Sequence, residues 1–371
     1  MPVELLGKSA EDLRALAEAW GEPAYRGAQI YHALYAERRF DFAAMTNLPA
    51  ALRERLESEA RITLPRIKRR YESKDGTIRY VLELGPAASV AEAGEEDRTG
   101  AASSARLKPL PTRPSTIETV FMPEEGRQTI CVSTQAGCAV DCRFCLTATL
   151  GLVRNLSPGE IIGQVLVAIE DNQGKLLPQT NVVLMGQGEP LLNYDAVMAA
   201  MRIVLDAEGM GFSPKHVTLS TSGIVPGIER MAQEEVRPKL AVSLNASSDE
   251  QRNHIMPINR KYPLAALIDA CRRYPLRPWE HITFEYVMLG GLNDTSEDAR
   301  RVVKLVANLR CKVNLIPWNP GELPYQAPTA ESLEAFRVLL TEHGVRAFVR
   351  FSRGQEIMAA CGQLALLESM Q

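Results

Sequence analysis

The sequence predicts an α/β fold in which parallel strands form a six-strand open barrel behind a small helical domain. From about residue 130, strand-like runs alternate with helical segments, a pattern typical of βα units and a parallel sheet. The runs are almost continuously apolar, as expected for strands covered on both faces. Polar, Gly and Pro residues cluster after the strands, at the edge that carries active sites in barrel-like α/β folds. A doubly wound sheet is the alternative.

The same alternation predicts the individual elements of the barrel. Strands are expected at TICVST, TNVVLMG, HVTLSTSG, KLAVSLNA, ITFEYVML and KVNLIPWN, with RAFVRFS as a seventh. Helices are expected at SPGEIIGQVLVAIED, YDAVMAAMRIVLDAE, VPGIERMAQEE, PLAALIDACRRY, SEDARRVVKLVANL and TAESLEAFRVLLTEH. We therefore assign residues 116–345 to the barrel, and residues 346–371 to a strand followed by a loop or helix.

Residues 1–75 are expected to form the small helical domain. Ser9 can cap a first helix, because Asp12 follows three residues later and apolar residues recur at helical spacing. The segments AYRGAQIYHALYAE and LPAALRERLESEA repeat this pattern. The downstream edge, PRIKRRY, suits either a solvated charge run or a phosphate contact, through Arg66, Lys68, Arg69 and Arg70.

Residues 76–115 are expected to contain a strand and a flexible loop. TIRYVLEL (77–84) has the β-branched and aromatic content of a strand, and TIETVFMP (116–123) resumes that pattern, so the two can pair. The segment 86–114 between them is rich in Ala, Gly, Ser and Pro and has no apolar period. Such a composition buries too little surface to offset the entropy of ordering, so we expect a mobile loop.

The overall composition narrows the class of protein. The chain has 371 residues, 46% hydrophobic and 23% charged, which is typical of a globular protein. Its net charge of −3 means that any RNA surface must be a local basic patch. No apolar run approaches the roughly 20 residues of a membrane span, and the first residues lack the features of a signal peptide. We expect a cytoplasmic protein with reduced thiols, which favours metal or redox chemistry for clustered cysteines.

The stretch CVSTQAGCAVDCRFC, residues 131–145, holds four of the seven cysteines. Cys138, Cys142 and Cys145 form a CxxxCxxC pattern just after the first barrel strand, and Cys131 lies off that pattern. A tetrahedral structural zinc needs a fourth Cys or His nearby, and none is in place. Three thiolates on an iron–sulfur cluster leave one iron open for a substrate or cofactor.

These motifs resemble the radical S-adenosylmethionine (SAM) superfamily. Phe144 precedes the third cysteine, and GQGEP (186–190) is similar to the Gly-Glu-Pro turn of that superfamily. The longer strings resemble the RlmN family of dual-specificity RNA methyltransferases, with the Cfr enzymes as near relatives: CVSTQAGC, NVVLMGQGEPLLNYD, VTLSTSGIVP, VNLIPWNP and AACGQLA. The resemblance runs from about residue 5 to 366 apart from 86–114, and it implies a partial (β/α)6 radical SAM barrel.

The resemblance also implies the cofactors and their ligands. Cys138, Cys142 and Cys145 would bind a [4Fe-4S] cluster, and S-adenosyl-L-methionine would chelate its open iron, with two SAM molecules used per turnover. Gly188 and Glu189 would bind the amino end of SAM. The rest of the SAM site would be lined by Ser220, Ser243, Leu244, Asn245 and Asn319. Asn245 stands where some relatives carry His.

The implied reaction is methylation of C2 of an adenosine in 23S rRNA and in tRNA. This carbon is electron-poor, so radical chemistry supplied by a cofactor is needed. Cys361 would carry the methyl group, Cys131 would resolve the adduct and leave a disulfide, and Glu118 would be the general base. An electron donor such as flavodoxin and a monomeric state are expected. The alternatives are Cfr-like methylation at adenine C8 and a non-catalytic, metal-containing RNA-binding protein.

The remaining candidates have ordinary structural interpretations. Cys271 and Cys311 are expected to be packed as small hydrophobic residues. The five histidines have no metal-like partners in the sequence and are expected to be structural or solvated: His32, His216, His254, His281 and His343. Three arginines alternate through the last strand and are candidates for phosphate contact: Arg346, Arg350 and Arg353.

Overall fold

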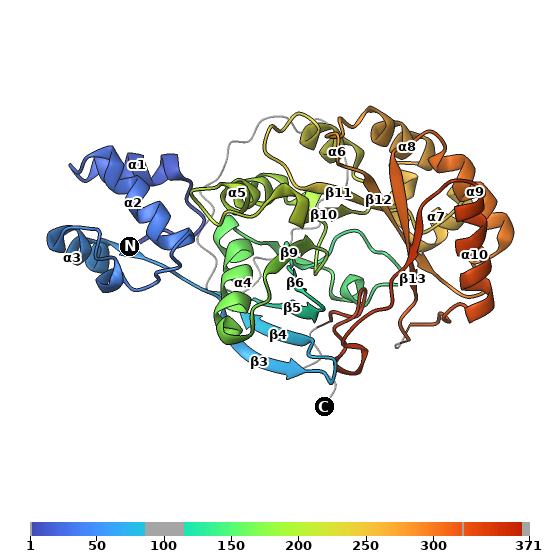
Figure 1. The fold of residues 1–371 in the computed structure, drawn as a ribbon, viewed down its shortest axis with the longest axis horizontal. Coiled ribbons are helices and arrows are strands. Elements are labelled where there is room, and N and C mark those ends of the chain that lie inside the picture. Colours follow the sequence, from blue (N-terminus) through green and yellow to red (C-terminus); the bar gives the residue numbers. More distant parts are fainter. Residues whose placement is uncertain (1, 86–114, 321–322, 366–371) are drawn as a thin grey trace, which may run out of the picture.

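The computed structural model describes residues 2–85, 115–320 and 323–365, and its centre is one ten-stranded mixed sheet (Figure 1). The strand order is β14-β13-β12-β11-β10-β9-β6-β5-β4-β3, and every neighbouring pair from β6 to β14 is parallel. These parallel strands follow one another in chain order without the reversal that defines a doubly wound sheet. The predicted open barrel is therefore confirmed over the doubly wound alternative.

The parallel strands coincide with the predicted runs. They are β6 (Arg127–Cys131), β9 (Gln179–Leu184), β10 (Val217–Thr221), β11 (Lys239–Ser243), β12 (Ile282–Met288), β13 (Cys311–Pro317) and the seventh candidate, β14 (Ala347–Val349). The strand β12 is buried on both faces along most of its length, which explains its lack of a polar alternation on the outer side. A short hairpin, β7 (Gln135–Gly137) and β8 (Leu152–Asn155), flanks the cysteine loop.

Helices lie along the outer side of the parallel strands (Figure 1). The predicted ones are α4 (Pro158–Asp171), α5 (Tyr194–Leu205), α6 (Val225–Met231), α8 (Leu264–Arg273), α9 (Ser296–Val306) and α10 (Ala330–Glu342). The structure adds α7 (Asp249–Ile255), which was not predicted because its sequence, DEQRNHI, has one apolar residue and so no apolar period. None of the helices in the described part of the chain has the length and apolar character needed to cross a bilayer.

Three antiparallel strands extend the sheet beyond β6: β3 (Arg66–Glu72), β4 (Ile78–Glu83) and β5 (Thr116–Glu124). The predicted pairing of 77–84 with 116–121 is confirmed, since Ile78 faces Phe121 and Glu83 faces Thr116. The loop prediction for 86–114 lies outside the described residues.

The basic run that the sequence placed at the edge of the helical domain is instead the edge strand β3. Charged side chains on such a strand discourage pairing with other chains. Arg66 forms an ion pair with Glu83, and Arg70 contacts Glu72 at 2.6 Å and Asp171 at 3.0 Å. Arg66 and Arg70 are thus ion-paired within the protein, which favours a structural role over a phosphate contact for these two arginines.

The N-terminal helices α1 (Ala10–Ala19), α2 (Ala24–Tyr35) and α3 (Ala50–Glu59) form a separate lobe beside the sheet (Figure 1). Ser9 and Asp12 form the capping box that their spacing predicted. The chain segments Val3–Glu4 (β1) and Ala60–Arg61 (β2) pair in parallel and close this lobe. Gly7 touches the start of α4 so closely that an added Cβ would lie 2.4 Å from the Gly159 nitrogen.

After β14 the chain returns across the carboxyl ends of the strands. It forms one short 3-10 turn, Gln355–Ile357, and no longer helix up to residue 365. The returning segment is held at both sides of the barrel. Glu356 accepts hydrogen bonds from Ser73 Oγ and the Lys74 backbone, and Leu146 N donates to Gly362 O at 2.7 Å.

Candidate active site

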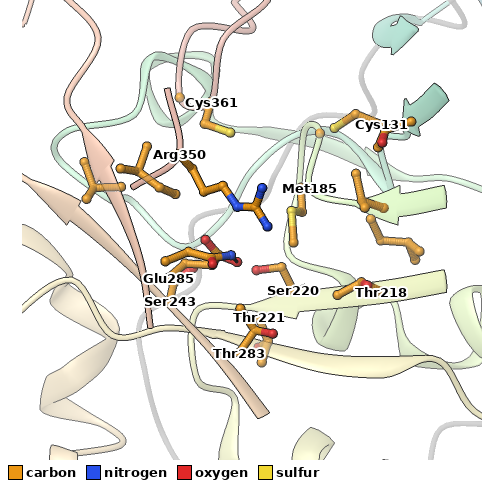
Figure 2. A pocket seen from close by; sticks show the side chains of 18 of the residues that line it. Cys131, Met185, Thr218, Ser220, Thr221, Ser243, Thr283, Glu285, Arg350 and Cys361 are labelled. Atoms are coloured by element: carbon orange, nitrogen blue, oxygen red, sulfur yellow. Dashed lines mark hydrogen bonds between the residues drawn. The ribbon is translucent and has the colours of Figure 1, made fainter. Parts of the chain in front are cut away.

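A cavity of about 630 Å³ runs along the inside of the barrel (Figure 2). Because side chains alternate along a strand, every second residue faces the interior. Thr283, Glu285 and Val287 of β12 line the cavity, as do Lys312, Asn314 and Ile316 of β13. Polar residues thus occur within otherwise apolar strands where they face this space.

The three clustered cysteines lie together at the carboxyl end of the cavity. Cys138, Cys142 and Cys145 all line it, on a loop held by backbone hydrogen bonds from Cys138 N to Gly151 O and from Arg143 N to Ile255 O, both 2.9 Å. Burial raises the pKa of the Cys138 thiol to about 11 and that of Cys142 well above its usual value. Neighbouring thiols also raise both values, so the thiols influence one another electrostatically.

This trio fits a cluster better than a single ion. Within the described residues, no three Cys, His, Asp or Glu side chains gather closely enough to hold one metal ion. A four-iron cluster takes each cysteine at a different corner, so its ligands can stand further apart while facing one space. Because burial raises the pKa of the Cys138 and Cys142 thiols, binding of a cluster would displace their protons.

Glu189 and Gly188 form the wall next to the cysteine loop. The Glu189 carboxylate is buried, which raises its pKa, and it accepts a hydrogen bond from Ser222 N at 2.6 Å. Gly188 has φ +99°, and an added Cβ would lie 2.6 Å from the Gln135 Cβ, so only glycine fits. Ser222 Oγ lines the same wall, and it is buried with no hydrogen-bond partner in the described structure. The wall therefore has both charge and spare hydrogen-bonding capacity for a cationic, polar ligand such as the amino end of SAM.

The other predicted SAM residues divide into two groups. Ser220, Ser243 and Asn245 line the cavity, and Figure 2 shows the two serines on adjacent strands. Asn245 has φ +55°, a conformation that Asn tolerates better than most residues, and its Oδ1 accepts from Val287 N at 2.8 Å. Leu244 does not line the cavity, because the alternation of the strand turns its side chain into the main core.

Asn319 lines the cavity and also holds the returning segment. Its Nδ2 donates to Ser352 Oγ at 2.8 Å and to the Cys361 carbonyl at 3.3 Å. Its Oδ1 accepts from Gln355 Nε2 at 3.0 Å. In this structure the side chain fixes the position of Cys361, a function that its predicted role as a SAM contact did not include.

Cys131 and Cys361 lie at the same end of the cavity, although 230 positions separate them in the sequence (Figure 2). Cys361 is exposed to the cavity, yet the surrounding protein desolvates its thiol and raises its pKa to about 11. Burial also raises the pKa of Cys131, and Cys361 contributes to that shift. All seven cysteines are free, so the expected disulfide is not present here.

Glu118 is fully buried beside the cavity and does not line it. Its carboxylate forms an ion pair with buried Arg79 and accepts from Gln187 Nε2 at 3.2 Å. An adjacent guanidinium favours the ionised carboxylate, which is the form that accepts a proton. Arg79 precedes Glu118 by 39 positions, and no sequence signal linked the two.

Several lining residues were not identified from the sequence. Burial raises the pKa of Glu285 to about 7, and its Oε1 accepts from Asn314 Nδ2 at 3.0 Å. A carboxylate within the apolar run ITFEYVM was the available signal for this residue. Met185 lies near Cys131 and Cys361 in Figure 2, and no polar pattern could have marked it.

The residues that were expected to be structural or solvated, and the last-strand arginines, lie in different surroundings. Cys271 and Cys311 are buried in the main core, as predicted. His216 lines the amino end of the cavity, where its Nδ1 lies 3.0 Å from Asn181 Oδ1. Among the last-strand arginines, Arg353 hydrogen-bonds to the Pro123 carbonyl, whereas Arg350 points into the cavity (Figure 2).

The sheet order, the three-cysteine loop and the Gly-Glu wall define a radical SAM fold. The family model of the radical SAM superfamily matches residues 132–306, and the model described as the ribosomal RNA large subunit methyltransferase N-terminal domain matches residues 3–62. A radical SAM methyltransferase structure from Sphaerobacter thermophilus is similar at a TM-score of 0.84 and 40% identity, covering 98% of this chain and 99% of that one.

Curated relatives narrow the assignment from the radical SAM superfamily to one family within it. A probable dual-specificity RNA methyltransferase RlmN from Koribacter versatilis (strain Ellin345) is 45% identical, over 95% of this chain and 98% of its own. The dual-specificity RNA methyltransferase RlmN of Anaeromyxobacter dehalogenans (strain 2CP-C) is also 45% identical, over 96% of this chain and 90% of its own. The chain belongs to the RlmN family of radical SAM RNA methyltransferases.

Proposed function

We propose that this enzyme methylates C2 of an adenosine in 23S rRNA and in tRNA. The observation that carries the proposal is that one cavity contains both the three-cysteine loop and Cys361. When bound on Cys138, Cys142 and Cys145, the [4Fe-4S] cluster supplies the electron that cleaves SAM to a 5′-deoxyadenosyl radical. The Glu189 wall would orient SAM beside the cluster.

In this proposal Cys361 carries the carbon to the RNA. Its thiol, with a pKa raised to about 11, must lose its proton before it accepts a methyl group from the first SAM. The second SAM would provide the radical that removes a hydrogen atom from this methyl group. The carbon radical would add to C2, and the adduct would lose one electron, which the oxidised cluster could accept, together with the C2 proton. Glu118 would accept the C2 proton. For this, either the adenine must move close to Glu118 or the Glu118 side chain must leave Arg79.

Cys131 would release the product. Its thiolate would attack the Cys361 sulfur, forming a disulfide as the bond from that sulfur to carbon breaks. The carbon keeps the electron pair of that bond and takes a proton, which completes the methyl group. A reductant must then restore both thiols, which suits a cytoplasmic compartment. The cluster would receive its electron from a one-electron donor such as flavodoxin. The proposal takes the protein to act as a monomer.

Product analysis tests this function directly. Anaerobically reconstituted, reduced protein is incubated with SAM and with 23S rRNA or tRNA, and the RNA is digested for mass spectrometry. We expect 2-methyladenosine and 5′-deoxyadenosine. Appearance of 8-methyladenosine instead would assign the chain a Cfr-like reaction. Absence of 5′-deoxyadenosine from iron-loaded protein would favour a non-catalytic RNA-binding protein.

A further inference from the structure

Cationic side chains from different strands line the cavity, and most of them lie at its amino end. Arg127 comes from β6, Lys239 from β11 and Lys312 from β13, and Lys215 precedes β10. Arg350 follows β14 and therefore lies nearer the carboxyl end, and its guanidinium points into the cavity, between Cys361 and Glu285 in the view of Figure 2. The clustered cysteines and Glu189 lie at the opposite, carboxyl end.

Most of this positive charge is not neutralised by the protein. The side chains of Lys239, Lys312 and Arg350 have no hydrogen bond or ion pair within the described residues. Burial lowers the pKa of both lysines, and neighbouring cations add to the effect: Lys312 for Lys239, and Arg350, Arg346 and Arg127 for Lys312. Cations held together in this way require a compensating anion.

The acidic groups nearby do not supply that anion. Glu124 is already paired with Arg127 at 2.5 Å. Glu285 attracts Lys312 and Arg350, but with a pKa raised to about 7 it is only partly ionised at neutral pH, and it accepts from Asn314. Glu280, which interacts electrostatically with Lys239, lies 3.7 Å from Arg277. The excess charge in the cavity is therefore positive.

The strand register places these cations along a path. Leu315 of β13 pairs with Val349 of β14, so Arg350 is level with Ile316, four residues above Lys312. At about 3.3 Å per residue, the two cationic levels lie roughly 13 Å apart along the strand. Asn314 lies between them, and its buried Oδ1 has no hydrogen-bond partner among the described residues. If the two cations bind successive phosphates, the acceptor between them can receive a hydrogen bond from the amino group of the base that lies between those phosphates.

We infer that RNA enters the barrel through its amino-terminal opening, with Lys239, Lys312 and Arg350 holding phosphates of the nucleotides next to the target base. This inference rests on the proposed function and adds the route of the substrate. The cavity is continuous from these cations to Cys361, so a base that enters from this end can reach the methyl carrier. A duplex is too wide for this space, so the target nucleotide enters extruded from its helix.

A polynucleotide fits the arrangement better than a free anion does. A single phosphate is best held by donors that converge on one point, whereas these cations are distributed over two levels on separate strands. Successive phosphates of a single strand can meet such cations one after another. Each phosphate contact also releases counterions, which makes the binding of the strand sensitive to salt.

RNA binding and its salt dependence test the route. The full-length protein and its Lys239→Met/Lys312→Met variant are titrated with a fluorescent single-stranded RNA oligonucleotide at several salt concentrations. We expect the variant to bind at least tenfold more weakly, and the slope of log K against log salt to fall by about 0.7 per lysine. Lys312→Arg keeps the charge and should preserve the slope. Lys304→Met, on the exposed outer face of α9, is the matched control.

The outcomes separate this inference from the function on which it rests. Unchanged affinity and slope in the double variant would overturn the entry route, even if the wild type methylates RNA normally. Inorganic phosphate is titrated against the same two proteins. If the double variant loses phosphate binding but keeps RNA binding, the entry route is also overturned, in favour of a small-anion site. Release of 5′-deoxyadenosine from SAM, measured in the same variants, should stay within about twofold of wild type, because the carboxyl end of the cavity is unaltered.

Discussion

The two ends of the barrel are built from the same strands, but their polar groups are satisfied differently. At the carboxyl end, buried Arg252 donates to the carbonyl oxygens of Ser222, Ser243 and Leu244, at 2.6 to 3.0 Å. At the amino end, Lys239 and Lys312 face the cavity without such partners in the described structure.

This difference indicates two kinds of ligand. The carboxyl end is fixed by protein hydrogen bonds before any ligand binds, which suits cofactors that must be held in one orientation. The amino end keeps charge unpaired, which suits a ligand that arrives, reacts and leaves. The following changes test the two ends, beginning with the one that should have the largest effect.

Replacing a clustered cysteine should abolish function at the carboxyl end. Cys142→Ala removes one of three thiolates, so we expect loss of the cluster and of all detectable methylation. Iron and sulfide content of anaerobically purified protein measures the first effect, and product analysis measures the second. Cys271→Ala, a buried core thiol, is the control and should retain iron. A fully loaded, active Cys142→Ala enzyme would remove these cysteines from the proposed site.

Replacing Cys131, the thiol proposed to release the product, should stop the enzyme once a single RNA is attached to Cys361. In Cys131→Ala the carbon can still join the RNA, but no thiolate remains to attack Cys361. We expect a covalent protein–RNA adduct, seen as a shifted band on a denaturing gel that nuclease treatment collapses. Cys311→Ala should give no adduct. Normal turnover by Cys131→Ala would show that another group resolves the intermediate.

Gly188 tests how strictly the carboxyl end is preorganised. In Gly188→Ala the added methyl group must displace Gln135, and the alanine must adopt φ +99°, which costs on the order of 1–3 kcal/mol. If this strain falls on the SAM wall, the dissociation constant for SAM should rise roughly 5- to 150-fold, measurable by calorimetry. Gly174→Ala is the matched control, because its Cβ meets no atom within 4 Å and φ is not positive. Equal SAM affinity in both variants would contradict the assignment of this wall.

Replacing Glu285 should change the free energy of unfolding, and the size of the change should depend on pH. Its pKa is raised by burial from 4.5 to about 7, so the folded state binds the proton more tightly than the unfolded state. The stabilisation from this proton is complete below pH 4.5 and is lost as the pH rises to about 7. Glu285→Gln should therefore be more stable than wild type above pH 7, by up to about 3 kcal/mol, with the gap closing as the pH falls. Denaturant melts from pH 5.5 to 8.5 measure this gap. A gap that is constant with pH would mean that Glu285 is ionised throughout this range.

The strands and the cysteine trio could be predicted from the sequence because both depend on local patterns. Apolar runs identified β6 and β9–β14, and CxxxCxxC identified one end of the cavity. The helix α7 was not predicted because its sequence, DEQRNHI, is almost entirely polar and has no apolar period. The basic strand β3 carries charge where a strand pattern expects apolar residues, because it lies at the sheet edge.

The contacts between distant segments could not be predicted in the same way. Glu118 meets Arg79 only because β4 and β5 pair, and the sequence does not encode that ion pair locally. The inward cations Lys239 and Lys312 belong to different strands, and each is a single charge within an apolar run. They face one cavity because the strands β11 and β13 both line its interior. The meeting of Cys131 and Cys361 was inferred from family resemblance and not from any local pattern.

The hydrogen bonds from Ser73 and Lys74 to Glu356 link the outermost hairpin of the sheet to the segment that presents Cys361. Edge hairpins open more often than central strands, so amide exchange in β3 should be faster than in β12. Each opening of the hairpin releases one of the two sides that hold the segment carrying Cys361, while Leu146 and Asn319 keep the other. The stability of the assembled catalytic centre therefore depends on the rim of the sheet as well as on its core.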